Sequence, residues 1–205
     1  MEKFHSYEPA AGHGLAHDPL NAIVAPRPIG WISSLSPAGV RNLAPYSFFN
    51  LFNYIPPIIG FCSIGRKDSI ANIEATREFV WNLVDRDCAE AMNASSASVA
   101  PDVDEFALAQ VDSLPSGKVA PPRVAGSPVQ FECRLSQIVQ LTAADATPVP
   151  AWLVMGEVVA IHIAERVIVD GSFSTTAARP VLRGGGWGDY FEVSEAALFR
   201  MKRPD

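Results

Sequence analysis

The most regular pattern in the sequence is an alternation of apolar and polar positions with a period of two, which is typical of strands with one buried face. From Val129 to Ser136, apolar residues occupy every second position and polar or charged residues lie between them. Residues 27–35 form a second predicted strand, and the turn residues 36–39 indicate that residues 40–43 pair back on it as a hairpin. Further strands are predicted over residues 58–64, 79–84, 152–163 and 167–169.

Helical signals lie between these predicted strands. Asp68 and Ser69 are typical of a helix start, and apolar residues follow them at helical spacing. Asp87 with Glu90 three positions later is a weak capping box for a second helix, and a third helix is predicted over residues 104–110. Because strands and helices do not alternate steadily, we predict a mainly-β fold, an antiparallel six-stranded barrel with helical excursions, rather than a doubly wound parallel sheet.

The composition supports one folded domain with a sizeable core. The chain has 205 residues, of which 48% are hydrophobic and 19% are charged. Residues 1–24 are rich in His, Gly, Pro and Ala, so we predict an N-terminal arm over this range and a single domain over residues 25–205.

Charge and hydropathy limit the partners and the cellular location that we expect for the protein. The net charge of −6 makes nucleic acid a poor partner, because neutralising phosphates requires clustered Lys and Arg. No stretch approaches the roughly 18–20 apolar residues that span a bilayer, and the first residues lack the pattern of a signal peptide. The three cysteines are widely spaced and odd in number, which argues against disulfides. We therefore expect a cytoplasmic protein that binds neither nucleic acid nor membranes.

Several motifs that carry protein-based catalysis are missing from the sequence. It contains no Walker loop, no G-x-S-x-G elbow, no H-E-x-x-H and no paired-cysteine metal spacing. The glycine-rich residues 184–188 lack the strand and helix context of a dinucleotide-binding turn. His13 and His17 are four positions apart but no third ligand accompanies them, so we interpret them as exposed residues of the arm. We expect no metal site and no catalytic protein residue.

The segment from Asn42 to Asn50 is the first candidate binding region. It leaves a predicted strand, follows no helical or strand period, and combines aromatic with small polar residues. Such a segment offers backbone N–H groups, a hydroxyl and a stacking surface, which suits a flat heteroaromatic ligand. The purely structural alternative is an aromatic-rich loop that closes one end of the barrel.

The second candidate region runs from Ser63 to Ser69, where a predicted strand leads into a helix. Arg66 and Lys67, a hydroxyl and the free amides of the helix start meet here, as a phosphate site requires. The alternative is an ordinary helix cap beside a solvated basic pair. Because the two regions lie about twenty residues apart and each follows a strand, together they favour a phosphorylated aromatic cofactor.

Taken together, several segments resemble the flavin reductase-like family, most closely the branch with flavoredoxin and the reductase component of nitrilotriacetate monooxygenase. The segments that carry this resemblance lie at residues 26–34, 42–50, 56–59, 66–69 and 72–73. Gly156-Glu157, Asp170-Gly171, Arg183, Gly185 and Tyr190 follow in the family's usual order. The resemblance extends from about Ala25 to Tyr190, although the stretch from Ala94 to Ser127 matches no motif of the family.

The resemblance implies an FMN-binding split barrel that forms a homodimer and holds the flavin between its subunits. It implies an NAD(P)H:FMN oxidoreductase, with NADH or NADPH as hydride donor and a monooxygenase or a redox protein as a partner. The flavin carries out hydride transfer, so the protein needs only to bind, orient and tune it. Two alternatives stay open, a flavoredoxin-like electron carrier with tightly bound FMN and a non-redox flavin-binding module.

The resemblance also assigns cofactor-binding residues. The isoalloxazine ring is expected against the segment formed by Ala44, Pro45, Tyr46, Ser47, Phe48 and Phe49, through its backbone and the Ser47 side chain. Trp31 and Ser33 are expected to flank the ring. The phosphate is expected at Ser63, Arg66, Lys67, Asp68 and Ser69. Arg183 and Tyr190 are expected to close the pocket, from the same or the partner subunit, and the stretch from Ala94 to Ser127 to shape the approach of nicotinamide or substrate.

Overall fold

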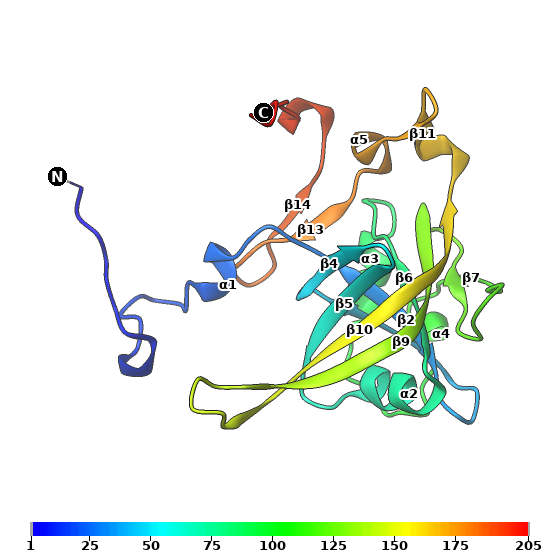
Figure 1. The fold of residues 1–205 in the computed structure, drawn as a ribbon, viewed down its shortest axis with the longest axis horizontal. Coiled ribbons are helices and arrows are strands. Elements are labelled where there is room, and N and C mark those ends of the chain that lie inside the picture. The colour runs from blue at the N-terminus through cyan, green and yellow to red at the C-terminus, as the bar shows by residue number, and fades with distance from the viewer. Residues whose placement is uncertain (1, 205) are drawn as a thin grey trace.

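A seven-stranded antiparallel sheet forms the centre of the structure, a computed structural model that describes residues 2–204 (Figure 1). The strand order is β3-β2-β6-β9-β10-β5-β4. In chain order the strands are β2 (Gly30–Leu35), β3 (Arg41–Tyr46), β4 (Phe49–Tyr54), β5 (Pro57–Ile64), β6 (Glu78–Asn82), β9 (Val129–Thr142) and β10 (Pro148–Ile163). The mainly-β, antiparallel fold class is therefore confirmed, with one strand more than the six expected.

The additional strand is β4, which sequence analysis assigned in part to a loop. It pairs with β5 and lies at one edge of the sheet, and five of its six residues are exposed to solvent. An edge strand with little buried surface lacks the apolar alternation that reveals a strand in sequence. The predicted hairpin is confirmed, since β2 pairs with β3 and Val40 O accepts a hydrogen bond of 2.9 Å from Ser36 N.

Short helices and small sheets surround the central sheet. The α-helices are α1 (Leu20–Ile23), α2 (Asp68–Thr76), α3 (Ala89–Ala94), α4 (Glu105–Leu108) and α5 (Thr175–Ala178), and the 3-10 helices are η1 (Pro9–Ala11), η2 (Glu165–Val167) and η3 (Glu195–Ala197). One small sheet contains β1 (Arg27–Pro28), β13 (Val181–Arg183) and β14 (Tyr190–Glu192). Two strand pairs complete the fold, namely β7 (Ser113–Leu114) with β8 (Arg123–Val124), and β11 (Ile168–Val169) with β12 (Ser172–Phe173).

The helix starts agree with the sequence in two cases and differ in one. α2 begins at Asp68 as predicted, and the Asp104 carboxylate accepts hydrogen bonds from the amides of Phe106 and Ala107 at the start of α4. α3 begins after Cys88 without a side-chain cap, and Asp85 Oδ1 accepts a hydrogen bond of 3.0 Å from Cys88 N in the turn before the helix. Asp87 therefore does not cap this helix.

Two buried clusters make up the core. The first fills the inside of the central sheet beneath α2 and includes Ile32, Phe61, Ile70, Phe79 and Val154. The second lies where β2 and β3 pack against α3 and α4, and it includes Trp31, Leu43, Met92, Phe106 and Val124. The region between the two clusters, where β3 ends and α2 begins, is the part of the fold that matters for the candidate site.

The first and last residues lie away from the central sheet. In Figure 1 the chain before α1 extends outward, and the C-terminal segment after β14 ends above the small sheet. α1 contacts the glycine-rich segment, because Gly185 lies directly against Ala22. The arm predicted over residues 1–24 includes Met1, which lies outside the described residues. No helix within residues 2–204 is long and apolar enough to cross a membrane.

One tight contact in the core generates a prediction. A methyl group at Gly156 in β10 would collide with the Phe79 ring and approach the carbonyl oxygen of Arg134 to 3.1 Å. We expect Gly156→Ala to lower the free energy of unfolding by about 1–3 kcal/mol, because neither neighbour has space to move in a packed core. Chemical denaturation measures this change.

The matched control is Gly117→Ala, where the nearest atom to an added methyl is Glu132 Oε1 at 3.8 Å. This variant should change the free energy of unfolding little. Equal stabilities of the two variants would contradict the packing described for Gly156.

Candidate functional site

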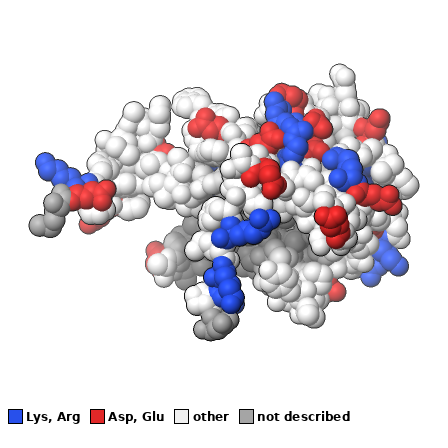
Figure 2. Space-filling view, turned by 90° about the horizontal axis from the view of Figure 1, so that it is seen from above, with Lys and Arg blue, Asp and Glu red and all other residues white. Residues whose placement is uncertain are grey.

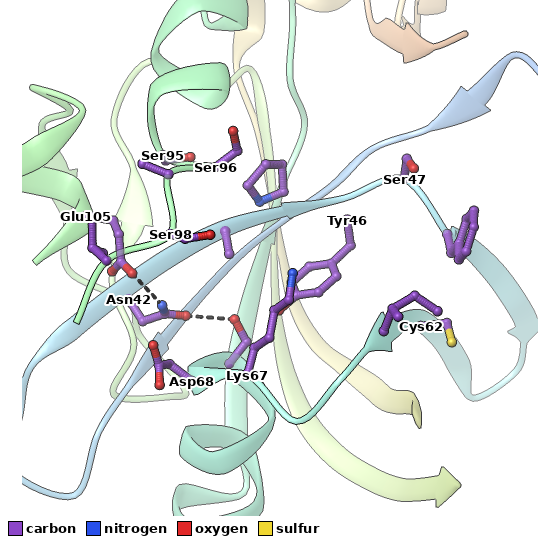
Figure 3. Close-up of a pocket in the computed structure, with 17 residues that line it drawn as sticks. Asn42, Tyr46, Ser47, Cys62, Lys67, Asp68, Ser95, Ser96, Ser98 and Glu105 are labelled. Carbon is purple, nitrogen blue, oxygen red and sulfur yellow. Dashed lines mark hydrogen bonds between the residues drawn. The ribbon is translucent and has the colours of Figure 1, made fainter. Parts of the chain in front are cut away.

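A cleft of about 500 Å³ opens where β3 ends and α2 begins (Figure 3). Both candidate regions from the sequence contribute to it. The predicted residues that line the cleft are Ala44, Pro45, Tyr46, Ser47, Phe48, Lys67, Asp68 and Ser69. The opposite wall comes from residues 95–99, and Glu105 lies at the deeper end.

The two regions meet because β3 contacts both β5 and α2. β3 runs antiparallel to β2 and ends at Tyr46, which lies opposite Gly30. β5 carries the chain to Gly65, whose amide donates a hydrogen bond of 2.8 Å to Pro150 O, and α2 begins three residues later. The first amides of an α-helix have no acceptor within the helix, so the start of α2 presents N–H groups to this part of the cleft.

A buried hydrogen-bond network underlies the polar end of the cleft. The Asn42 Oδ1 atom accepts hydrogen bonds from Ser34 Oγ at 3.1 Å and from Ser69 Oγ at 2.8 Å. The Asn42 Nδ2 atom donates to Glu105 Oε1 at 2.9 Å, as the dashed lines in Figure 3 mark for two of these contacts. Four elements, β2, β3, α2 and α4, are thereby fixed relative to one another.

Glu105 is a member of the cleft that sequence reasoning missed. Its Oε2 atom accepts a hydrogen bond of 3.3 Å from the Leu43 amide, and the residue is buried. Burial raises the pKa of the Glu105 carboxyl, against the lowering effect of its hydrogen bonds. The only sequence signal was its place directly after the helix cap at Asp104, which does not reveal that the side chain turns toward β3.

Lys67 and Arg66 are adjacent in sequence but have different surroundings. Lys67 lines the cleft and forms no salt bridge with any residue from 2 to 204. Arg66 is outside the lining residues, forms an ion pair with Glu74, and lies over the Trp152 ring at 5.9 Å. Of the two cations expected at a phosphate, the structure therefore brings only Lys67 to the cleft.

Three other residues that the sequence placed at the flavin lie behind the residues that line the cleft. Trp31 is fully buried and its indole N–H donates a hydrogen bond of 2.9 Å to Ser95 Oγ, so it holds the opposite wall rather than facing the cleft. Ser33 is also buried, and its hydroxyl donates to Pro122 O. The Ser63 hydroxyl donates to Gly65 O at 2.9 Å and so supports the turn that leads into α2.

An apolar groove of about 620 Å³ continues from the cleft along β4. The cleft and the groove share Ser47, Phe48 and Cys62, and Phe52 and Leu153 also line the groove. Phe49 borders it as well, stacked on Trp81 with ring centroids 5.4 Å apart. Burial raises the pKa of the Cys62 thiol, so this group stays protonated at neutral pH.

Arg183 and Tyr190 lie on the small sheet, away from the cleft of the same chain. They face each other across β13 and β14, with the guanidinium 4.9 Å from the ring centroid. Tyr190 lines a separate hollow that also contains Arg86 and Trp187. Neither residue lines the cleft.

The charges around the site are of both signs. Lys67 lies in the cleft with the carboxylates of Asp68 and Glu105. Figure 2 shows Lys and Arg interspersed with Asp and Glu over the face in view, without one continuous basic region. Within residues 2–204, no group of three or more His, Cys, Asp or Glu side chains is arranged to hold a metal ion. The cleft therefore combines one lysine and two carboxylates with the apolar groove beside it.

A family model described as "Flavin reductase like domain" matches residues 24–176 of the chain. The protein belongs to this family. The chain is also 35% identical over 189 residues to an uncharacterized protein, BH2278, of Halalkalibacterium halodurans, which covers 88% of this chain and 87% of that protein. The resemblance inferred from the sequence motifs is thus confirmed.

Solved structures of flavin reductase-like proteins share the fold. Nitrilotriacetate monooxygenase component B from Bacillus cereus matches with a TM-score of 0.87 and 27% identity, over 98% of this chain and 100% of that one. The 2-nitrobenzoate 2-nitroreductase NbaA from Pseudomonas fluorescens matches with a TM-score of 0.79 and 29% identity, over 90% and 88% of the two chains. Flavoredoxin of Desulfovibrio vulgaris (Miyazaki F) has the same fold at a TM-score of 0.73 and 19% identity, over 87% and 91%. The split barrel and the branch of the family expected from sequence are confirmed.

The stretch from Ala94 to Ser127 is the part of the candidate site that the sequence predicts least. It matched no motif, yet residues 95–99 form one wall of the cleft and Glu105 reaches its deeper end. The serine-rich run 95–98 is the one sequence signal, and alone it is typical of any loop. The anchoring hydrogen bond from Trp31 to Ser95 joins residues 64 positions apart, so the sequence does not reveal it.

Proposed function

We propose that the protein is an FMN-binding oxidoreductase that accepts hydride from NADH or NADPH, with the cleft as its flavin site. The observation that carries this proposal is the meeting of residues 44–48 with Lys67, Asp68 and Ser69 in one cleft. Membership of the flavin reductase-like family supports it. The free thiols of all three cysteines agree with a cytoplasmic location.

The polar end of the cleft fits a phosphate group. The start of α2 offers amides and the positive end of a helix dipole, and Lys67 adds a charge that no described carboxylate neutralises in a salt bridge. The Asn42 network holds Ser69 in place. In this assignment Lys67 and the Ser69 amide bind the phosphate, while Ser63 supports the turn before α2 and Arg66 pairs with Glu74 outside the cleft.

The apolar end fits a flat ring system. Residues 44–48 run along the cleft and lead to Phe48 and Cys62, where the apolar groove begins. When bound, FMN supplies the hydride-accepting chemistry. The protein's part is to orient the ring through the backbone of this segment and to keep one face open to a nicotinamide, and residues 95–99 border that approach.

We propose two candidate electron acceptors. The similarity to nitrilotriacetate monooxygenase component B supports delivery of reduced flavin to a monooxygenase partner. The similarity to 2-nitrobenzoate 2-nitroreductase, together with the apolar groove beside Phe48, supports direct reduction of a nitroaromatic substrate as the second candidate. A flavoredoxin-like carrier would instead keep its flavin and exchange electrons only with other proteins.

We expect the purified protein to show the visible spectrum of a flavin and to release FMN rather than FAD on denaturation, because the cleft has one helix start for one phosphate. Anaerobic NADH and NADPH titrations should bleach the spectrum, and turnover with excess FMN or 2-nitrobenzoate identifies the acceptor. Reduction by neither nicotinamide, with FMN still bound, would favour the carrier. A colourless protein that fails to bind added FMN would contradict the proposed function.

We also propose a homodimer, built on the exposed apolar surface beside the groove. Leu51, Phe52 and Ile55 on and after β4 are 43%, 52% and 91% exposed, and clustered apolar exposure at a sheet edge indicates a protein contact. A twofold contact here would place the partner subunit beside the groove. It would also bring a second chain near the cleft, and we propose that Arg183 and Tyr190 serve the partner's site.

Sedimentation velocity should therefore report a species of about twice the 22.1 kDa chain mass at micromolar concentration. Phe52→Asp should shift the protein toward the monomer, because a charge at this position would be buried on pairing. A wild-type monomer across the micromolar range would contradict the dimer without touching the flavin assignment.

Lys67→Ala tests the phosphate assignment. The substitution removes a charge-assisted contact worth roughly 1.5–3 kcal/mol, so FMN affinity should fall about tenfold or more. The affinity for riboflavin, which has no phosphate, should hardly change. Titration of both ligands by fluorescence quenching measures the difference.

Arg66→Ala is the matched control, because this cation pairs with Glu74 outside the cleft. It should leave FMN affinity nearly unchanged. Parallel losses of FMN and riboflavin affinity in Lys67→Ala would refute the phosphate role of this lysine.

A further inference from the structure

The geometry points to a specific binding role for the Tyr46 side chain: we propose that its hydroxyl donates a hydrogen bond to an anionic oxygen of the ligand at the start of α2, which is the phosphate when the ligand is FMN. This inference rests on the proposed function and goes beyond it. The sequence placed Tyr46 at the flavin through its backbone, whereas the structure gives its side chain a separate task.

The Tyr46 ring is held rigidly in the core. Only 7% of the residue is exposed, and its ring lies against Phe61 with centroids 4.4 Å apart and planes inclined by 37°. Ile59 and Ile70 belong to the same buried cluster. Because the ring is enclosed, the direction of its hydroxyl is set by packing and does not depend on a bound ligand.

The hydroxyl of this buried ring has no hydrogen-bond partner within residues 2–204. The nearest hydroxyls, those of Ser69 and Ser63, lower the pKa of Tyr46, but neither oxygen lies in hydrogen-bond geometry with the Tyr46 Oη atom. A buried polar group without a partner destabilises a fold, and native proteins retain few of them. An unpartnered hydroxyl at the lining of a cleft therefore indicates a ligand atom that completes it.

The surroundings identify the chemistry of that ligand atom. Tyr46, Lys67 and Ser69 line the same end of the cleft, and Figure 3 shows the side chains of Tyr46 and Lys67 reaching into it. Burial raises the pKa of Tyr46 more than the neighbouring Ser69 and Ser63 hydroxyls lower it, so the phenol keeps its proton. A donor beside a lysine and a helix start suits an acceptor that carries negative charge.

Tyr46→Phe isolates the hydroxyl, because it keeps the ring and its packing. We expect the ligand-free variant to be as thermally stable as the wild type or more so, since it loses only an unpartnered polar atom. FMN affinity should fall about tenfold, and riboflavin affinity should stay within about twofold. Stability and affinity thus move in opposite directions, which the loss of a merely structural contact would not produce.

Tyr7→Phe is the matched control, because this tyrosine lies on the N-terminal arm, where its ring contacts those of His5 and His13, and lines neither the cleft nor the groove. It should change neither the melting temperature nor the affinity for either ligand. Unchanged FMN affinity in Tyr46→Phe would overturn the inference, as would equal losses for FMN and riboflavin. A lower melting temperature of ligand-free Tyr46→Phe would also overturn it, because the hydroxyl would then have a partner inside the protein.

A second probe separates this inference from the proposed function. Inorganic phosphate, compared with chloride at matched ionic strength, should raise the melting temperature of the wild type and have a smaller effect on Tyr46→Phe. If the wild type binds no flavin but shows this difference, the proposed function fails and the role of Tyr46 stands. If neither FMN nor phosphate acts differently on the two proteins, the role of Tyr46 is refuted.

Discussion

The hydrogen bonds of the buried Asn42 side chain connect the parts of the chain that make the cleft. Its oxygen accepts from Ser34 and Ser69, and its nitrogen donates to Glu105, so one amide joins β2, β3, α2 and α4. Each of these bonds lies in a buried setting, where losing one partner leaves the others unsatisfied and is costly. The start of α2 is thereby fixed against the end of β3, so Lys67 lines the same cleft as the segment 44–48. The proposed site depends on this geometry, because Lys67 and Tyr46, the residues proposed to bind the phosphate, both line the cleft there.

The sequence predicted those parts of the fold and site whose signal is local. The alternation from Val129 onward gave β9, and Asp104 gave the start of α4 through its own side chain. The two candidate regions were visible because each concentrates its chemistry within seven to nine consecutive residues. The two regions lie about twenty residues apart in the sequence, and the structure brings residues 44–48 and 67–69 together in one cleft.

The parts that sequence reasoning missed depend on contacts between distant residues. β4 has too little buried surface to show an apolar alternation, and α3 begins without the side-chain cap that the capping box predicted. Trp31 was expected at the flavin but binds Ser95 behind the wall, since alternation identifies a strand face without saying what covers it. Arg66 was expected at the phosphate but pairs with Glu74, eight positions further along the chain, and the sequence alone does not reveal this pairing.

The central claim is that one cleft binds FMN with its phosphate at the start of α2 and its ring along residues 44–48. A crystal structure of the protein with FMN tests this most directly. The account predicts phosphate oxygens within hydrogen-bond distance of the first amides of α2, of Lys67 Nζ and of Tyr46 Oη. A flavin bound in the hollow beside Trp187, or one whose phosphate points away from α2, would contradict it.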